Sequence, residues 1–324
     1  MENSLAIIFG PAVSESLQNS ILETLKNHGE QVEPIGVNWK NFSDGERQPQ
    51  IMGNLRSKDT YIINSTQPPA QNFQDLSMLL RAANEATTDR LTAVIPYLGL
   101  ARQDRKDLPR VPVGAKLMAD QISVAMGTEQ PKHVMVFHPH FIQLPGYFNV
   151  PVDIIYPKRI FEKKIKDLFE DFSNVVFVAP DVGASAQIKN YADRFNTQYA
   201  VVNKTRDPKT GKTVSDSIIG DVQGKHAIVI DDIGDTCGSI KVAAKALRDA
   251  GASSIRFFVT HGLFSGKCFE NLDEANLDEI YTTDSINGIA LPPKTEVITC
   301  GGLIGDAIYC NYRGLSLSGM LENK

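Results

Sequence analysis

Apolar residues follow two alternating patterns along the chain. Short runs rich in β-branched and aromatic residues are followed by longer stretches in which apolar residues recur every three or four positions. The run at 5–9 predicts a strand, and Leu17, Ile21, Leu22 and Leu25 predict one face of a helix over 14–28. This alternation predicts an α/β fold in which mainly parallel sheets are flanked by helices.

The alternation restarts near residue 150, and the chain is long enough to form two hydrophobic cores. A length of 324 residues exceeds what one core usually fills. We therefore predict two domains of similar build, over 1–149 and 150–324. The junction is expected in LPGYFNVP, 144–151, because its proline and glycine residues interrupt both patterns.

Composition and charge narrow the class of protein. Hydrophobic residues make up 42% of the chain and charged residues 22%, as in ordinary globular proteins. The net charge of -5 argues against a broad basic surface for nucleic acid. Four cysteines without CxxC spacing predict no disulfide framework, which fits a reducing, cytoplasmic location. With no long apolar segment or secretory leader pattern in the sequence, we expect no membrane partner.

A pair of acids ends one of the predicted strands. The stretch VIDDIGDTCGS, 229–239, places Asp231 and Asp232 where the strand should give way to a helix. Backbone N–H groups at the start of a helix, with the hydroxyls of Thr236 and Ser239, suit a phosphate monoester. The two carboxylates would repel a phosphate, so we expect them to accept hydrogen bonds from sugar hydroxyls or to join a metal shell. The alternative is that one acid caps the helix and the other is solvated.

The same stretch resembles the phosphoribosyl-diphosphate signature of two groups, the type I phosphoribosyltransferases and the ribose-phosphate diphosphokinases. The resemblance implies that Asp231 and Asp232 meet the hydroxyls of ribose 5-phosphate. The motif alone does not separate the two groups. The residues that would hold the 5-phosphate are Asp235, Thr236, Cys237, Gly238 and Ser239.

A motif in the first half resembles the diphosphokinases alone. The segment NFSDGERQ, 41–48, is similar to their F-x-D-G-E segment. In that family the residues at these positions come from a neighbouring chain and help to hold adenine. The resemblance therefore implies that Phe42, Asp44 and Glu46 contribute to ATP binding.

A second motif of the first half, 96–120, resembles the Y-x-R-Q-D-R-K stretch of the same family. The resemblance implies that Arg102, Gln103 and Asp104 bind ATP from within the chain. A forked guanidinium suits a polyphosphate, and a side-chain amide suits the edge of a base. The alternative for so hydrophilic a stretch is a solvated charged loop.

Two further segments resemble the parts of the diphosphokinases that handle metal. In FHPHFIQLPGYF, 137–148, His140 lies at the family's metal-binding histidine, and in VAPDVGASAQ, 178–187, Asp181 would lie beside the ribose and its metal. The resemblance implies Mg²⁺ as the cofactor, organised by His140 and Asp181. The alternatives are a structural histidine and an aspartate that caps a helix.

The sequence departs from the family pattern at three positions in these segments. His138 replaces an aspartate, Ala184 a glycine and Gln187 an arginine. Imidazole is a poor ligand for a hard cation such as Mg²⁺. The resemblance still implies a metal role for Asp181. It does not extend to the electrostatics and subunit contacts that the family associates with the arginine.

The polar stretch VNKTRDPKTGKTVSDS, 202–217, predicts a hairpin with its turn at DPKTG. Lys204 and Arg206 lie two positions apart, hence on one face if the strand continues into them. They match the Lys-x-Arg of the diphosphokinases' catalytic flexible loop, so the resemblance implies that they are catalytic. A cationic loop suits phosphoryl transfer, which depends on positioning and charge neutralisation. The alternative is an exposed solubilising hairpin.

The segment VTHGLFSGKC, 259–268, also matches the family's T-H-G-x-F-S segment. No role for His261 follows from the sequence, and we expect a structural histidine at the end of a strand.

With these motifs in the family's order, the chain is identified as a member of the ribose-phosphate diphosphokinase family. The implied fold is two type I phosphoribosyltransferase-like domains, the first with the ATP motifs and the second with the ribose 5-phosphate loop and the flexible loop. The implied reaction moves the diphosphoryl group of Mg-ATP to the 1-hydroxyl of ribose 5-phosphate, giving 5-phosphoribosyl 1-diphosphate and AMP for nucleotide biosynthesis. The resemblance also implies a homo-oligomer, a hexamer.

Three other functions remain open at this point. A phosphoribosyltransferase would share 229–239 but would not need 41–48 or 96–120. A catalytically silent regulatory subunit is favoured by the departures at His138 and Gln187, whereas Lys204 and Arg206 argue for activity. A simple sugar-phosphate kinase would release ADP instead of AMP.

Overall fold

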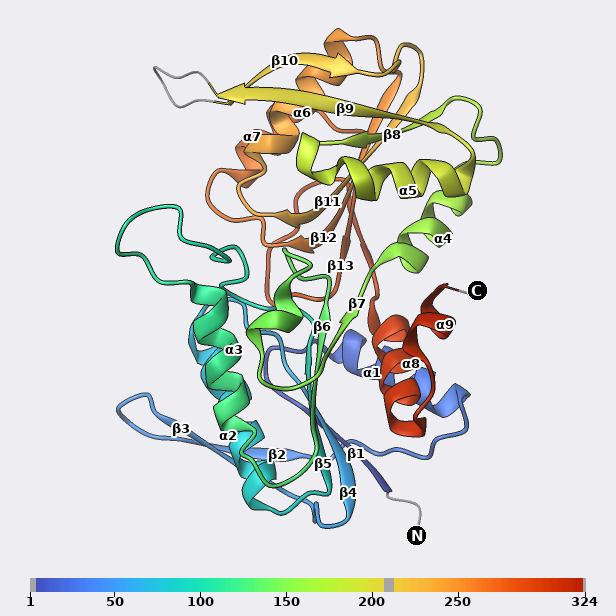
Figure 1. Ribbon diagram of the computed structural model, residues 1–324. Coiled ribbons are helices and arrows are strands. Elements are labelled where there is room, and N and C mark those ends of the chain that lie inside the picture. The colour runs from blue at the N-terminus through green and yellow to red at the C-terminus, as the bar shows by residue number, and fades with distance from the viewer. Residues whose placement is uncertain (1–3, 207–212, 323–324) are drawn as a thin grey trace. The chain divides into compact units, whose positions relative to one another are not determined.

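The computed structural model describes residues 4–206 and 213–322, and these residues form two compact units (Figure 1). The first unit contains the chain up to Arg159 together with Asp284–Gly288 and the C-terminal segment from Thr299. The second unit contains Ile160–Thr283 and Ile289–Ile298. Each unit is an α/β structure with its own sheet, as the alternating pattern predicted.

The sheet of the first unit has five strands, all parallel. Most residues of its three inner strands are buried, which is typical of parallel strands covered on both faces. In sheet order the strands are β1 (Ser4–Phe9), β4 (Lys58–Ile63), β5 (Arg90–Ile95), β6 (Lys132–Phe137) and β7 (Val152–Ile155).

Helices cover both faces of this sheet. Leu17, Ile21 and Leu25 are fully buried, as predicted, and their helix is capped by the Ser14 hydroxyl, which accepts from Leu17 N at 3.2 Å. Figure 1 shows α2 and α3 on one side of the sheet and α1 and α8 on the other. The helices are α1 (Glu15–Asn27), α2 (Gln71–Glu85), α3 (Gly114–Ala125), the 3₁₀ turn η1 (Leu144–Tyr147), α8 (Gly301–Arg313) and α9 (Leu317–Glu322).

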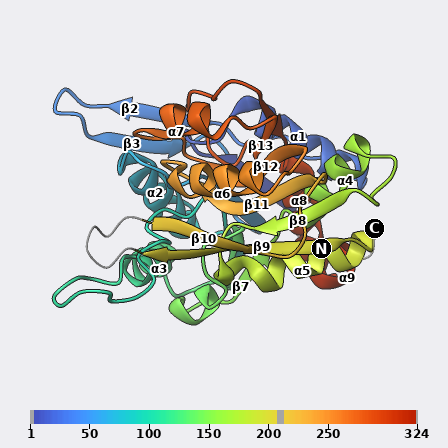
Figure 2. The same ribbon diagram turned by 90° about the horizontal axis from the view of Figure 1, so that it is seen from above.

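A separate two-stranded antiparallel hairpin belongs to the first unit. It consists of β2 (Val37–Asn41) and β3 (Arg47–Ile51), which pair from Val37 with Ile51 to Asn41 with Arg47. Figure 1 and Figure 2 both show it extending past α2. The motif residues 42–46 form its tip.

The sheet of the second unit has seven strands, and only β10 runs antiparallel to its neighbour. From β8 the chain first adds β9 and β10 on one side, and it then returns to add β11 on the other side. The β8–β11 boundary is therefore a topological switch point. In sheet order the strands are β10 (Thr213–Ile219), β9 (Gln198–Arg206), β8 (Val175–Ala179), β11 (His226–Gly234), β12 (Ser254–Gly262), β13 (Glu279–Thr283) and β14 (Thr295–Ile298).

Helices also cover both faces of the second sheet. Because side chains alternate along a strand, Val176 and Val178 pack with α6 and α7, whereas Val175 and Phe177 pack with α4 and α5. The buried residues of both apolar clusters are nearly inaccessible to solvent. The elements are α4 (Lys158–Leu168), the 3₁₀ turn η2 (Val182–Ala184), α5 (Ser185–Phe195), α6 (Gly238–Asp249) and α7 (Cys268–Ala275).

The observed division differs from the predicted boundary between 149 and 150. Strand β7 lies in the first unit because it pairs with β6, with Phe137 opposite Ile155. Helix α8 also belongs there, because it packs closely on α1: a Cβ added to Gly305 would lie 2.7 Å from Thr24 Cβ. The C-terminal residues thus return to the first unit, although they follow the second in sequence.

Across the described ranges, each helix is too short or too polar to span a lipid bilayer.

Candidate functional site

Three carboxylates mark the carboxyl ends of β8 and β11, the neighbouring strands at the switch point of the second unit. Asp181 follows β8 by two residues, and Asp231 and Asp232 lie near the end of β11. The two strands run parallel, with Val229 opposite Val178. Ligands of open α/β sheets bind at this edge, so the fold brings together acids that lie 50 residues apart in sequence.

The electrostatics of this edge favour a ligand that donates hydrogen bonds to carboxylates or carries positive charge. Burial raises the pKa of Asp231 well above its usual range, and the charges of Asp232 and Asp181 raise it further. The carboxylate of Asp231 accepts from Asp232 N at 2.9 Å, and Asp232 accepts from Ile233 N at 2.8 Å. Hydroxyl donors or a divalent cation would relieve the repulsion among the three acids.

Asp181 is also the N-cap that the alternative prediction described. Its Oδ1 accepts from Ala184 N at 3.2 Å at the start of η2, and its side chain is exposed. A cap of this kind uses one acceptor position of one carboxylate oxygen and leaves the other positions of the carboxylate available. The capping role and a ligand-binding role are therefore compatible.

The predicted phosphate loop, 235–239, connects β11 to α6. Helix α6 begins at Gly238, and Cys237 before it has a left-handed backbone with φ 58°. The first N–H groups of a helix have no partner within the helix and carry partial positive charge. Thr236 and Ser239 are exposed at this point. The loop thus presents donors suited to an anion, without a lysine of its own.

Cys237 packs behind the loop against a second thiol. Its Sγ lies 2.8 Å from Cys268 Sγ, and both are free and buried. The hydrogen bond with Cys268 raises the pKa of Cys237, and burial raises it further. Cys237 is therefore a neutral packing residue of the loop.

Two residues that the sequence did not single out also contact this loop. Ser265 Oγ donates to Asp235 Oδ1, and Asn271 Nδ2 donates to Thr236 O at 2.8 Å. Ser265 lies within the T-H-G-x-F-S match, which was the available signal. Asn271 lies in α7 and carried none. His261 of the same motif is buried at the end of β12, which agrees with a structural role.

The basic pair Lys204 and Arg206 lies in β9. The strand continues through both residues, as expected, and pairs them with Ser215 and Thr213 of β10. The predicted hairpin is therefore present. Its predicted turn, 207–211, lies outside the described residues.

The first unit presents the F-x-D-G-E residues at the tip of the β2–β3 hairpin. Phe42 N donates to Glu46 O at 2.8 Å, and Glu46 N donates to Asp44 Oδ1 at 3.0 Å, so the tip is internally braced. The Phe42 ring is 38% exposed, with Lys40 Nζ 4.5 Å from its centroid. All three predicted side chains are available to a ligand or another chain.

Arg102, Gln103 and Asp104 lie in the long loop after β5. Backbone bonds hold the loop to the start of α3, where Ala115 N donates to Gln103 O at 3.1 Å. The Tyr147 hydroxyl donates to Asp104 O. The loop is thus anchored through the backbone oxygens of Gln103 and Asp104, while Arg102 and Gln103 are exposed to solvent.

The two histidines after β6 have different surroundings. His138 is 4% exposed; its N donates to Ile155 O at 2.8 Å and its ring meets the edge of Tyr156. It is a structural residue between β6 and β7. His140 is exposed. Among the described residues, there is no set of three or more His, Cys, Asp or Glu side chains placed to hold a metal ion.

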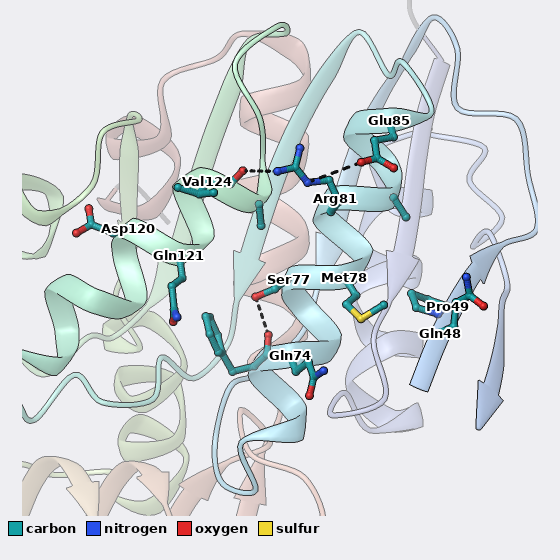
Figure 3. Close-up of a pocket in the computed structure, with 13 residues that line it drawn as sticks. Gln48, Pro49, Gln74, Ser77, Met78, Arg81, Glu85, Asp120, Gln121 and Val124 are labelled. Carbon is teal, nitrogen blue, oxygen red and sulfur yellow. Dashed lines mark hydrogen bonds and ion pairs between the residues drawn. The ribbon is translucent and has the colours of Figure 1, made fainter. Parts of the chain in front are cut away.

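A groove of about 730 Å³ lies between α2 and α3, beside β3 (Figure 3). Arg81 donates to Val124 O at 3.3 Å and approaches Glu85 at 3.9 Å along its wall. Phe73 and Met78 supply apolar lining. None of the predicted site residues lines this groove, and we do not assign it to the reaction.

Two family models match the chain. The model described as the N-terminal domain of ribose phosphate pyrophosphokinase matches residues 6–126. The model described as the phosphoribosyl synthetase-associated domain matches residues 208–321. The matches fall in the two halves of the sequence that carry the motifs.

Curated relatives match over most of the chain. The ribose-phosphate pyrophosphokinase of Chlorobaculum tepidum is 36% identical over 286 residues, 88% of this chain and 87% of the relative. That of Thermosipho africanus is 37% identical over 278 residues, 86% of each chain. The crystal structure of phosphoribosylpyrophosphate synthetase from Mycobacterium smegmatis is 25% identical, with a TM-score of 0.84, and the match covers 96% of this chain and 99% of that one.

Proposed function

The chain belongs to the ribose-phosphate pyrophosphokinase, or diphosphokinase, family of enzymes, and we propose that it transfers the diphosphoryl group of Mg-ATP to the 1-hydroxyl of ribose 5-phosphate. The products are AMP and 5-phosphoribosyl 1-diphosphate, an activated ribose for nucleotide biosynthesis. The observation that carries the proposal is the edge of the second sheet, where three carboxylates adjoin a loop of N–H and hydroxyl donors.

Ribose 5-phosphate is oriented at this edge by both of its ends. The 5-phosphate binds the loop 235–239, where the start of α6 supplies N–H donors and Thr236 and Ser239 supply hydroxyls. Asp231 and Asp232 accept hydrogen bonds from the ribose hydroxyls, because an ionised carboxylate offers only acceptor oxygens. Fixing the phosphate and the hydroxyls together sets the direction of the 1-hydroxyl.

ATP is held by the two motifs of the first unit. The Arg102 guanidinium binds the polyphosphate, Gln103 meets the base edge, and Asp104 completes the loop. Phe42, Asp44 and Glu46 act on the ATP of a neighbouring chain within a homo-oligomer, a hexamer. The exposed aromatic ring at the hairpin tip supports this, since an apolar ring in water gains from contact with a base.

The donor set fits Mg²⁺ rather than a softer metal. Asp181 offers carboxylate oxygens, and the raised pKa of Asp231 reflects negative charge that a cation would offset. Mg²⁺ commonly binds one or two carboxylates together with waters and substrate phosphates, so a full protein cage is not required. Asp181 would hold it in the second unit, and a metal role for His140 remains what the resemblance implies. When bound, the ion would supply positive charge that neutralises the polyphosphate.

In the reaction, the ribose 1-hydroxyl attacks the β-phosphorus of ATP; the bond from the β-phosphorus to the α-phosphate oxygen breaks, and AMP leaves. Lys204 and Arg206 stabilise the negative charge on the transferring group. None of the predicted residues serves as a general base, so alignment and charge neutralisation supply most of the rate enhancement.

All four cysteines are free thiols, which supports a reducing cytoplasmic setting.

One assay tests the function. Purified protein is incubated with ATP, Mg²⁺ and ribose 5-phosphate, and AMP is resolved from ADP. We expect AMP in equal amount to 5-phosphoribosyl 1-diphosphate. ADP without AMP would indicate a simple sugar-phosphate kinase. Folded protein that forms neither product would overturn the assigned reaction.

A further inference from the structure

The oxygen atoms at the start of the phosphate loop are held by a second segment of the chain. We call residues 263–271 the bracket segment; they follow β12 and enter α7. Leu263 N and Phe264 N both donate to Gly234 O at 2.9 Å, Ser265 N donates to Asp235 O at 3.0 Å, and Asn271 Nδ2 donates to Thr236 O at 2.8 Å. Three consecutive carbonyls that lead into the loop therefore point at the bracket segment.

The same segment holds the one carboxylate within the loop. Ser265 Oγ donates to Asp235 Oδ1, in addition to the backbone bond between these two residues. A carboxylate in a phosphate-binding loop would repel the ligand if it turned inward. The double contact with Ser265 fixes the position of Asp235 relative to the loop backbone.

The bracket segment is itself tightly constrained. Phe264 has φ 46°, which is costly for a bulky side chain and is sustained only where the surroundings impose it. A Cβ at Gly262 would lie 2.4 Å from the Phe264 ring, so the turn needs glycine there. Cys268 N donates to Ser265 O at 3.1 Å, and Lys241 Nζ lies 2.5 Å from Glu274 Oε2, which joins α6 to α7. Strain of this kind is found at functional sites more often than elsewhere.

From these contacts we infer that Ser265 and Asn271 are positioning residues for ribose 5-phosphate. By engaging the oxygens of Asp235 and Thr236, they leave the N–H and hydroxyl donors of 236–239 as the face that meets the 5-phosphate. The inference rests on the proposed binding of ribose 5-phosphate by this loop. Neither residue touches the reacting atoms, so their effect falls on substrate affinity rather than on the chemical step.

Two single variants test this role. Ser265→Ala removes the hydroxyl, and Asn271→Asp removes the Nδ2 donor while it keeps Oδ1, which accepts from Lys241 Nζ at 3.3 Å. We expect each variant to raise the KM for ribose 5-phosphate by about three- to tenfold, the effect of one lost hydrogen bond. The KM for ATP and the thermal midpoint stay near wild-type values. Ser265→Thr retains the hydroxyl and is expected to restore the wild-type KM.

Lys294→Met is the matched control, because Lys294 Nζ donates to Leu277 O at 2.8 Å in the same unit. It removes a bond of the same kind from a side chain to a carbonyl, without contact with the loop. We expect its KM for ribose 5-phosphate to be unchanged. If Ser265→Ala fails to fold, Asn271→Asp and Ser265→Thr still test the inference.

Calorimetric binding of ribose 5-phosphate separates this inference from the reaction. If Ser265→Ala and Asn271→Asp bind ribose 5-phosphate as tightly as the wild type does, the bracket role is overturned and the reaction is left intact. Weaker binding in both variants, with no AMP formed by the wild type, supports the bracket role and overturns the reaction. A wild type that does not bind ribose 5-phosphate overturns both.

Discussion

Arg47 and Asp75 form an ion pair where β3 leaves the tip of the β2–β3 hairpin, with 2.8 Å between Arg47 Nη1 and Asp75 Oδ2. The Asp75 side chain is 1% exposed, and Gln71 Nε2 donates to its other oxygen at 2.8 Å. Burial raises the pKa of Asp75, although Gln71 and Arg47 oppose the rise. The Arg47 guanidinium also lies over the Trp39 ring, 4.5 Å from its centroid. The pair thus fixes to α2 the hairpin whose tip carries an ATP motif.

Replacing Arg47 with Met is expected to lower the free energy of unfolding of the first unit by about 2 kcal/mol at pH 8, because a buried carboxylate loses its cation. A carboxyl group whose pKa is raised on folding favours the folded state when protonated, and that contribution is lost as the pH rises through the folded pKa. The deficit of the variant should therefore be smaller at pH 5 than at pH 8. Urea unfolding followed by the fluorescence of Trp39, the single tryptophan, measures it.

Arg81→Met is the control for this prediction. Arg81 faces Glu85 at 3.9 Å across an exposed surface, where the glutamate side chain is 69% exposed. Exposed pairs of this kind contribute about 0–1 kcal/mol. Equal losses in the two variants, or a loss in Arg47→Met that does not change with pH, would contradict the assigned role of Asp75.

Asp231→Asn is expected to stabilise the protein without ligand while it weakens ribose 5-phosphate binding. The pKa of Asp231 is raised by burial and by Asp232 and Asp181, so its ionisation opposes folding. The stability that the protonated group contributes is present below its unfolded pKa of about 3.9 and is lost as the pH rises through the folded pKa. The gain should appear in the thermal midpoint at pH 8, at about 2–4 °C per kcal/mol, and diminish toward pH 4.

Asp171→Asn provides the opposite case. Hydrogen bonds from Ser173 lower the pKa of this exposed carboxylate, so its charged form favours folding above the unfolded pKa. The amide variant is therefore expected to lower the thermal midpoint slightly at pH 8. A drop in Asp231→Asn as well would show that the three acids at the sheet edge do not oppose folding.

Gly114→Ala is expected to raise the KM for ATP. A Cβ at Gly114 would lie 2.4 Å from Gln103 Oε1 and 3.1 Å from Gln103 Cβ. The amide of Gln103 would have to move, while the helix α3 that begins at Gly114 tolerates alanine. We expect a several-fold higher KM for ATP, an unchanged KM for ribose 5-phosphate and a thermal midpoint near the wild type.

The comparison for this variant is Gly36→Ala, because a Cβ at Gly36 would meet nothing within 4 Å. Steady-state kinetics with each substrate varied in turn distinguish the two variants. An unaltered KM for ATP in Gly114→Ala would remove Gln103 from the proposed ATP site.

The local pattern predicted the elements well because burial on one face leaves a period in the sequence. Leu17, Ile21 and Leu25 are buried as their spacing indicated, whereas Leu22 is half-buried. The strand β11 carries the two acids but continues past them to Gly234. The pattern indicated two units but did not show that β7 and α8 belong to the first one. This assignment depends on how β7 pairs and on how the glycines of α8 approach α1, and both are contacts between residues distant in sequence.

The candidate site likewise has residues that the sequence identified and supporting residues that it did not. The motifs singled out the residues proposed to meet the ligands, such as Asp181 and the loop 235–239, because those residue types have recognisable chemistry. Their supports were missed: Ser265 lies 30 residues from Asp235, and Arg47 lies 28 residues from Asp75. Both residues lie in motif segments, but a motif does not say which distant side chain a serine or arginine contacts, so these contacts require the fold.

Lys204 and Arg206 carry the last prediction. Lys204→Met and Arg206→Met remove positive charge that would act on the transferring diphosphoryl group rather than on either bound substrate. Each is expected to lower kcat by about 10²–10³, the effect of one electrostatic donor lost from a transition state. The KM for ribose 5-phosphate should change little, because its phosphate loop lies on β11 and α6, whereas these residues lie on β9.

The control is Lys189→Met, which removes an exposed lysine of α5 and should leave kcat unchanged. Because the two charges would act on one group, the double variant should lose less than the product of the single losses. Product analysis of AMP at saturating substrate gives kcat for the wild type, the two single variants, the double variant and the control. Turnover that is undiminished in the double variant would reduce the β9–β10 hairpin to a solubilising feature, while AMP formed by the wild type would still establish the reaction.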